Sequence, residues 1–205
     1  AALFAAAGRL DWTPGWVVAA LSLLGLLVNF LLVRAKNPVL LGERWKRRTG
    51  TKRFDKILLS IYVPVAFSLP VVAGLDARFG WSTLPPWAAW TGAALFVLGS
   101  IPTAWAMAVN PHLEPTVRIQ RDRDHRVIAA GPYAILRHPM YFGMILQQAG
   151  TAALLGSAWA WLPVAAFVLL IAIRTALEDR TLQDELPGYR EYAARTRCRL
   201  IPFIW

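Results

Sequence analysis

The residues best suited to chemistry lie in one short polar stretch, GPYAILRHPMYFG at positions 131–143, between two strongly apolar regions. A proline disfavours helix in the residue before it and is well suited to open a helix. We therefore predict a short loop, a helical turn, and a helix that begins at Pro139. The free N–H groups at a helix start favour a carboxylate or phosphate. Arg137, His138 and Tyr141 lie at this start.

A second group of polar residues, Arg174, Glu178 and Asp179, closes the last apolar run. Arg174 and Glu178 are four residues apart and would share a helix face. An ionisable residue inside an apolar run suggests a functional site, and Glu178 is the predicted partner of Arg174. Each group also has a structural interpretation. The first could be a proline-rich connector, and Arg174 could extend its charge to lipid headgroups.

The elements that must position these residues are membrane helices. The chain has 205 residues, of which 57% are hydrophobic and 17% charged, against about 25% charged in soluble proteins. Apolar runs at 16–33, 57–75, 87–109, 139–156 and 158–177 predict an all-α integral membrane protein with five transmembrane helices. The last two form a C-terminal helical hairpin. Prolines within the second and third runs are tolerated inside helix bundles.

The distribution of positive charge predicts the orientation of these helices. Segments 34–56, 110–138 and the end of the last helix onward hold nine, five and six Lys and Arg residues, which is 20 of the 22 in the chain. Because cytoplasmic segments carry such an excess, we place the N-terminus outside and the C-terminus inside the cell (inner) membrane. The formal charge of +10 then needs no nucleic-acid partner, and membrane lipids are the expected surroundings.

This topology brings the two polar groups together, because the inner ends of a helical hairpin are neighbours. The predicted cytoplasmic pocket combines Tyr133, His138 and Tyr141 from one side with Arg174, Glu178 and Asp179 from the other. An arginine binds a carboxylate, while tyrosine faces and a glutamate favour a cation. S-adenosylmethionine carries both kinds of charge, so we predict it as the ligand.

Other chemistries have little support in the sequence. The chain contains no G-x-G-x-x-G, G-x-x-x-x-G-K-[ST], H-E-x-x-H or G-x-S-x-G pattern. Cys198 is the single cysteine, which excludes an intrachain disulfide and a cysteine metal cluster. The histidines, at 112, 125 and 138, are too dispersed for a metal motif, although His112 with Glu114 could in principle bind an ion. We predict no metal site.

Several of these motifs together resemble the isoprenylcysteine carboxyl methyltransferase family. They are HRVIAAGPY from His125, RHPMYFG from Arg137, EDR from Glu178 and LIP from Leu200. Bacterial members and the related phospholipid methyltransferases share this C-terminal half. The resemblance covers about residues 110–205. We therefore divide one structural domain into an N-terminal three-helix membrane region, 1–109, and a methyltransferase core, 110–205.

The resemblance implies an integral membrane methyltransferase that uses S-adenosylmethionine. It assigns cofactor binding to Gly131, Pro132, Tyr133, His138, Tyr141, Glu178 and Asp179. Catalytic roles fall to Arg174, Glu178 and His138. Arg174 would contact a carboxylate of the substrate or cofactor, and Glu178 or His138 would accept a proton from an amine or thiol. The family commonly has a second glutamate where this chain has Asp179, whose side chain is shorter.

The methyl acceptor is left open by the sequence. It would be lipidic or small and apolar, with a carboxylate, amine or thiol as the reacting group, and would approach laterally from the lipid. Two other functions fit parts of the pattern. A membrane reductase would bind a nicotinamide cofactor in a similar hairpin, and a scaffold or lipid-binding protein would bind neither cofactor. The sequence does not indicate an oligomeric state.

Overall fold

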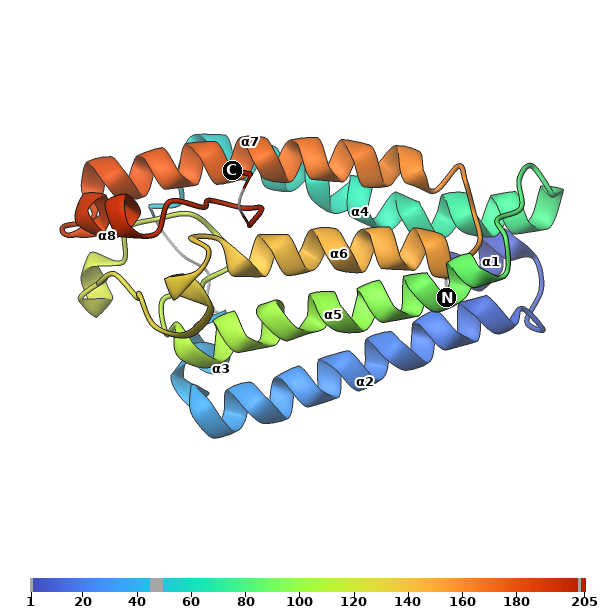
Figure 1. The fold of residues 1–205 in the computed structure, drawn as a ribbon, viewed down its shortest axis with the longest axis horizontal. Helices are drawn as coiled ribbons and strands as arrows, with labels where there is room; N and C mark the ends of the chain where they lie inside the picture. Colours follow the sequence, from blue (N-terminus) through green and yellow to red (C-terminus); the bar gives the residue numbers. More distant parts are fainter. Residues whose placement is uncertain (1, 45–49, 203) are drawn as a thin grey trace.

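A computed structural model describes residues 2–44, 50–202 and 204–205 (Figure 1). All regular structure in these ranges is helical, which confirms the all-α prediction. In chain order the elements are α1 (Ala2–Ala7), α2 (Thr13–Lys36), α3 (Pro38–Arg44), α4 (Arg53–Phe79), α5 (Trp87–Val109), η1 (Arg121–Arg123), η2 (Gly131–Ala134), α6 (Pro139–Leu154), α7 (Trp161–Glu185) and α8 (Tyr189–Arg195). The η elements are short 3₁₀ turns.

Four of the helices, α2, α4, α5 and α7, are long and apolar enough to cross a membrane. Helices α2 and α4 contain the first two predicted spans, and α5 matches the third. Helix α7 overlaps the fifth, 158–177, but begins at Trp161 and continues to Glu185. Leucines in the middle of α2 are exposed, including Leu23 at 68% and Leu26 at 67%. Exposed leucines in such number are expected where a helix faces lipid, so the chain is a multi-pass membrane protein.

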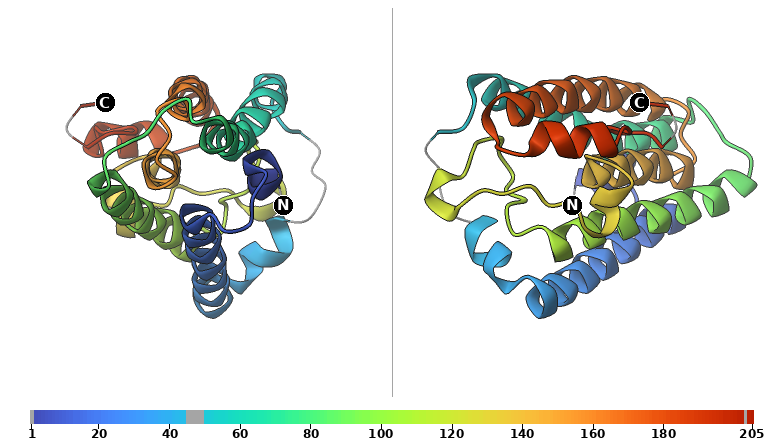
Figure 2. Two further views of the ribbon diagram at one scale, coloured as in Figure 1. Left: turned by 90° about the vertical axis from the view of Figure 1, so that its right-hand side faces the viewer. Right: turned by 60° about the vertical axis from the view of Figure 1, so that its left-hand side comes forward.

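Helix α6 differs from the predicted fourth span. It has 16 residues, which at about 1.5 Å per residue gives a length of about 24 Å. This is less than the hydrocarbon thickness of about 30 Å. In the end-on view of Figure 2, α6 lies in the middle of the bundle, with α4, α5 and α7 around it. The five-span arrangement and the orientation of the chain therefore remain predictions.

Two pairs of glycines allow α5 and α6 to pack with their backbones in contact. A Cβ atom at Gly99 would lie 2.5 Å from the carbonyl oxygen of Gly143, and one at Gly150 would lie 2.6 Å from that of Gly92. Only residues without a side chain permit such a close approach. Gly92 and Gly99 therefore allow close packing, and this contact fixes the beginning of α6 against α5.

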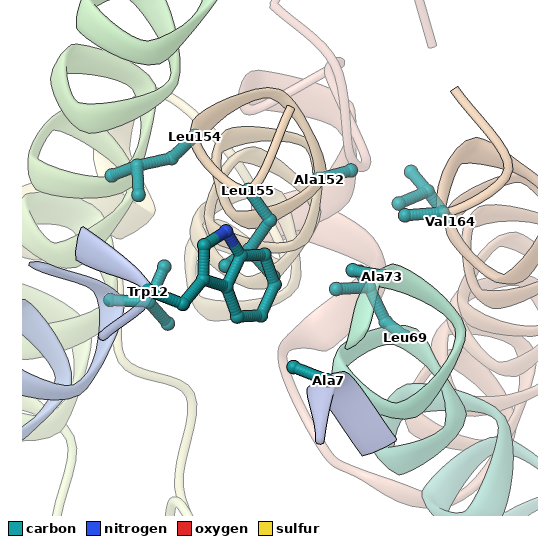
Figure 3. Close-up of a cluster of buried hydrophobic side chains, with 10 residues drawn as sticks. Ala7, Trp12, Leu69, Ala73, Ala152, Leu154, Leu155 and Val164 are labelled. Carbon is teal, nitrogen blue, oxygen red and sulfur yellow. The ribbon is translucent and has the colours of Figure 1, made fainter. Parts of the chain in front are cut away.

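Apolar packing and one buried carboxylate hold the end of the bundle that contains the α6–α7 turn. Trp12, Leu69, Leu155 and Val164 belong to a buried cluster there, drawn in Figure 3. In α4, the Asp76 carboxylate accepts hydrogen bonds from the hydroxyls of Ser82 and Ser157. These contacts tie α1, α4, α6 and α7 together far from the polar pocket.

The polar segments gather at the opposite end, where α3, η1, η2 and α8 lie (left in Figure 1). The described parts of the three segments predicted to be cytoplasmic are thus together. Lys46, Arg47 and Arg48, which the charge count includes, lie outside the described residues. Which side of the membrane this end faces remains a prediction.

Candidate functional site

The polar stretch at 131–143 folds as predicted. A 3₁₀ turn covers Gly131–Ala134, and α6 begins at Pro139 with His138 as its N-cap residue. Gly131 has a φ of +60°, which favours glycine, and a Cβ atom there would lie 2.9 Å from Nε1 of Trp105. The prediction that Gly131 contacts a cofactor is not tested. Gly131 begins a turn that directs the following residues into the bundle.

Tyr133 is fixed at both its hydroxyl and its backbone. Its hydroxyl accepts a hydrogen bond from Nδ2 of Asn110 at 3.0 Å, and its carbonyl oxygen accepts one from the Tyr192 hydroxyl at 2.7 Å. Burial raises the pKa of Tyr133 well above its usual range. The side chain is therefore a neutral, rigid wall of the site.

The beginning of α6 meets the end of α7 through a short hydrogen bond. The Tyr141 hydroxyl donates to Oε2 of Glu178 at 2.6 Å. The ring of His138 stacks on that of Tyr141 with centroids 5.6 Å apart and an interplanar angle of 6°. The predicted neighbourhood of these two polar groups is confirmed, and it places an imidazole, a phenol and a carboxylate in one row.

These side chains line a polar cavity, which we call the inner cavity. Its wall includes Tyr133, His138, Tyr141 and Glu178, together with residues of the 110–128 loop. His138 is 7% exposed. Its Nε2 atom makes no hydrogen bond within the described residues, but it lies 3.6 Å from Oδ1 of Asp179.

Asp179 has a different environment from Glu178. Its carboxylate is 1% exposed and accepts hydrogen bonds from Arg137 at 2.9 Å, Tyr189 at 2.9 Å and Gln183 at 2.7 Å. Nε of Arg199 lies 3.2 Å away. Neither Asp179 nor Pro132 is on the wall of the inner cavity. The Asp179 carboxylate therefore connects the segment before α6 with α7, α8 and the C-terminal segment. Its predicted contact with a cofactor is not tested.

Arg174 does not pair with Glu178 as predicted. Its Nε donates to Oδ1 of Asp55 in α4 at 2.7 Å, and the two side chains are 3% and 0% exposed. Nη1 donates to the Tyr62 hydroxyl and Nη2 to the carbonyl oxygen of Pro115. The reason is burial: the Asp55 carboxylate is fully enclosed and requires a cation, whereas Glu178 is partly exposed.

A second cavity, which we call the apolar cavity, lies between α2 and α4 and is backed by α5 and α6. Its volume is about 1140 Å³, and its wall includes Phe67, Phe96, Met144 and Phe167. Tyr62 also lines it. The Arg174 guanidinium carbon lies 5.3 Å from the ring centroid of Tyr62 and 5.2 Å from that of Tyr141. The Arg174 guanidinium therefore lies between Tyr62, which lines the apolar cavity, and Tyr141, which lines the inner cavity.

The loop before η2 carries a polar cluster, of which the sequence indicated only the pair His112 and Glu114. The rings of His112 and His125 are 4.7 Å apart, and Arg118 donates from Nε to Glu114 at 2.8 Å. Burial lowers the pKa of His112, and lowers that of His125 to about 4. No group of three potential metal ligands occurs within the ranges that the structure describes. The spacing of these histidines carries no motif, so only the fold brings them together.

An all-helical membrane protein with a polar pocket at one end and an apolar cavity between its helices is thus the class that the structure defines. The profile of the Isoprenylcysteine carboxyl methyltransferase (ICMT) family matches residues 92–184. This match confirms the family resemblance that the motifs indicate. It begins inside α5, upstream of the boundary that we placed at 110.

Three relatives extend this comparison. The chain is 30% identical over 108 residues to the cobalt-zinc-cadmium resistance protein CzcN of Cupriavidus metallidurans, covering 52% of this chain and 49% of the relative. It is 27% identical over 126 residues to protein-S-isoprenylcysteine O-methyltransferase B of Arabidopsis thaliana, covering 58% and 61%. It is 26% identical over 133 residues to the nickel-cobalt-cadmium resistance protein NccN of Alcaligenes xylosoxydans xylosoxydans, covering 64% and 59%. The chain thus matches about half to three fifths of the length of these relatives.

Proposed function

We propose that the chain is an S-adenosylmethionine-dependent methyltransferase of the cell (inner) membrane, acting on a lipidic or small apolar acceptor at the cytoplasmic interface. One observation carries this proposal. Two cavities of opposite character approach each other at Arg174, with Tyr62 on the apolar side and Tyr141 on the polar side. Such an arrangement suits a reaction between a water-soluble cofactor and an apolar substrate. The family match supports methyl transfer as that reaction.

The residues of the inner cavity offer chemical partners for the charged groups of S-adenosylmethionine. The Glu178 carboxylate and the ring faces of Tyr133 and Tyr141 favour a cation, and the His138 imidazole lines the same cavity. When bound, this cofactor supplies a methyl group already activated on a sulfonium. Gly131 and Pro132 would contribute through the turn that they form, and Asp179 by holding Arg137 and Tyr189.

The chain's own residues then have three tasks. Tyr141 orients Glu178 through the 2.6 Å hydrogen bond, and Asp55 fixes the position of Arg174. The packed rings around them exclude water, which strengthens the electrostatic interactions inside the site. A carboxylate acceptor needs no base, whereas an amine or thiol would transfer its proton to Glu178 or to His138.

The apolar cavity supports a lateral route for the acceptor. Its wall reaches along α2 from Val18 to Lys36, so it extends over most of the length of that helix. A lipid tail could occupy it while the reacting group lies near Tyr62. We place the polar end of the bundle on the cytoplasmic side, with the N-terminus outside, because 20 of the 22 Lys and Arg residues belong to that side.

Ligand-dependent stability of the purified protein tests this function. Millimolar S-adenosylmethionine, or its demethylated product, should raise the melting temperature, because a ligand that binds only the folded state stabilises it. A nicotinamide cofactor should not. Isotopic methyl transfer into a total lipid and metabolite extract would then identify the acceptor. No shift with either methyl-cofactor ligand, or a shift with the nicotinamide cofactor alone, would contradict the proposal.

A further inference from the structure

Two neighbouring glutamines line the apolar cavity from the middle of α6. The residues of α6 on the cavity wall are Met144, Gln147, Gln148 and Thr151. Their spacing of three and four residues puts them on one face of the helix. Both glutamine side chains are half-buried. A primary amide in apolar surroundings is costly unless it makes hydrogen bonds, so the partners of these two amides are informative.

The amide of Gln147 is only partly satisfied by the protein. Its Nε2 donates a hydrogen bond to Oγ of Ser100 in α5 at 2.9 Å. The Ser100 hydroxyl in turn donates to the carbonyl oxygen of Phe96 at 2.9 Å. Within the ranges described, Oε1 of Gln147 accepts no hydrogen bond. This oxygen can therefore accept one from a molecule in the cavity.

The amide of Gln148 makes no hydrogen bond to any residue that the structure describes. Its oxygen and nitrogen are nevertheless not among the fully enclosed polar atoms that lack a partner. Both atoms are therefore accessible, and Gln148 lines the apolar cavity. Its amide can both donate and accept a hydrogen bond there.

The polar groups continue across the cavity to α2. A Cβ atom at Gly25 would lie 4.0 Å from Oγ of Ser100. Asn29, one turn further along α2, also lines the cavity, and its Nδ2 donates to Sδ of Met107 at 3.3 Å. We call Asn29, Ser100, Gln147 and Gln148 the polar belt. All four are uncharged, and on the described part of the wall the one charged residue is Lys36, at the end of α2.

The polar belt lies at a defined distance from the tyrosines where the two cavities approach each other. Gln148 follows Tyr141 by seven residues, which is two helical turns or about 10 Å along α6. Met144 lies between them and packs in the cluster that contains Tyr62 and Tyr141. A chain in the cavity with its reacting group near Tyr62 would therefore pass the belt about 10 Å from that group.

We propose that the polar belt binds a hydroxyl group in the chain of the methyl acceptor. The inference rests on the proposed function and narrows its acceptor to a lipid with a polar group in mid-chain. A hydroxyl can donate to Oε1 of Gln147 and accept from Nε2 of Gln148, so it satisfies both open positions. A plain hydrocarbon chain would leave both amides without partners, and the belt should therefore discriminate against it.

Matched fatty acids with and without a chain hydroxyl test this inference. The probes are octadecanoic acid, 10-hydroxyoctadecanoic acid and 2-hydroxyoctadecanoic acid. In an extended chain, bonds of about 1.5 Å put the hydroxyl at carbon 10 roughly 11 Å from the carboxyl carbon. The full chain in detergent micelles would be titrated with each probe, and the rise in melting temperature gives the apparent affinity.

The variants are Gln148→Leu, Gln147→Leu and the control Ser68→Ala. Leucine has nearly the same size as glutamine and forms no hydrogen bond through its side chain. The hydroxyl of Ser68 in α4 donates to the carbonyl oxygen of Val65, and Ser68 does not line the cavity. Comparing each probe between variants removes the difference in how the probes enter the micelles.

The wild type should bind 10-hydroxyoctadecanoic acid about tenfold more tightly than octadecanoic acid, and 2-hydroxyoctadecanoic acid within about threefold of it. Gln148→Leu should reduce this preference to less than about threefold without weakening the binding of octadecanoic acid. Ser68→Ala should keep the preference. Gln147→Leu breaks the hydrogen bond to Ser100. If it does not fold, Gln148→Leu decides, since it breaks no hydrogen bond among the described residues.

Three results would overturn the inference. They are equal affinity of the wild type for all three probes, no binding of any probe, and a preference that persists in Gln148→Leu. The proposed function is tested separately by the methyl cofactor. If S-adenosylmethionine and its product do not bind but the hydroxyl preference is found, the function fails and the belt remains a lipid-binding site. If the cofactor binds and the preference is absent, only the role of the belt is wrong.

Discussion

Nε of Arg174 and Oδ1 of Asp55 are 2.7 Å apart, although the two residues are separated by 119 positions in the chain. This ion pair joins α7 to α4, and the other oxygen of Asp55 accepts a hydrogen bond from the backbone N–H of Val117 at 2.8 Å. The N-terminal helices are therefore part of the site that the C-terminal half builds. Residues 110–205 would lack the counter-charge of Arg174 if they were separated from 1–109.

Asp55→Ala should destabilise the protein strongly. It leaves the guanidinium of Arg174 enclosed without a counter-charge, and breaking such a pair costs about 3–5 kcal/mol. We expect this loss in denaturant unfolding in detergent. The matched control is Glu185→Gln, which removes the partly exposed pair with Lys52 and should cost less than about 1 kcal/mol. Equal effects of the two changes would show that the buried pair is not important for stability.

Tyr141→Phe should isolate the contribution of the hydrogen bond to Glu178. The ring and its stacking on His138 remain, while the orientation of the carboxylate is lost. We expect about a tenfold weaker affinity for S-adenosylmethionine, since a hydrogen bond to a charged group contributes about 1.5–3 kcal/mol. Isothermal titration calorimetry would measure it. Glu178→Gln should weaken the binding of S-adenosylmethionine at least as much. If both variants bind the cofactor as tightly as the wild type, Glu178 is not part of the cofactor site.

Gly99→Ala should disrupt the contact between α5 and α6. The new methyl group would lie 2.5 Å from the carbonyl oxygen of Gly143, so the two backbones must separate. Overpacking of this kind costs about 1–3 kcal/mol, and the movement of α6 should also reduce cofactor binding. Gly25→Ala is the control, because the nearest atom to its new methyl would be 4.0 Å away. A lower melting temperature for Gly99→Ala than for Gly25→Ala would support this close packing. Equal melting temperatures would argue against it.

Acid should destabilise the protein through the histidine pair. In the unfolded chain a histidine takes up its proton near its ordinary pKa of 6.5, whereas folded His125 does so at about 4. Over this window the unfolded state binds more protons, so the stability present above pH 6.5 is lost as the pH falls towards 4. The melting temperature of His125→Gln, measured from pH 7 to 4, should fall less steeply than that of the wild type. Parallel curves would exclude His125 as the source.

Local rules predicted the polar stretch well. Pro139 begins α6 because a proline is favoured at the first position of a helix, and the turn at 131–134 follows from the glycine–proline pair. The hairpin argument correctly placed Tyr141 beside Glu178. The length and apolar character of α2, α4, α5 and α7 were also evident from the sequence.

The partners of charged residues were not predictable in the same way. The rule of residues four apart favoured Glu178 for Arg174, but the enclosed carboxylate of Asp55 pairs with Arg174 instead. Asp55 lies in a charged segment that resembled an ordinary cytoplasmic loop. The histidine cluster depends on the course of a loop without regular structure.

The short length of α6 affects how deep in the membrane its ends lie. A helix of 16 residues covers about four fifths of the hydrocarbon thickness, so at least one of its ends must lie beneath the level of the lipid phosphates. If that end is the one bearing His138, methyl transfer would take place below the headgroups, and an acceptor could arrive by diffusing within one leaflet. Its tail would then never have to meet water during the reaction.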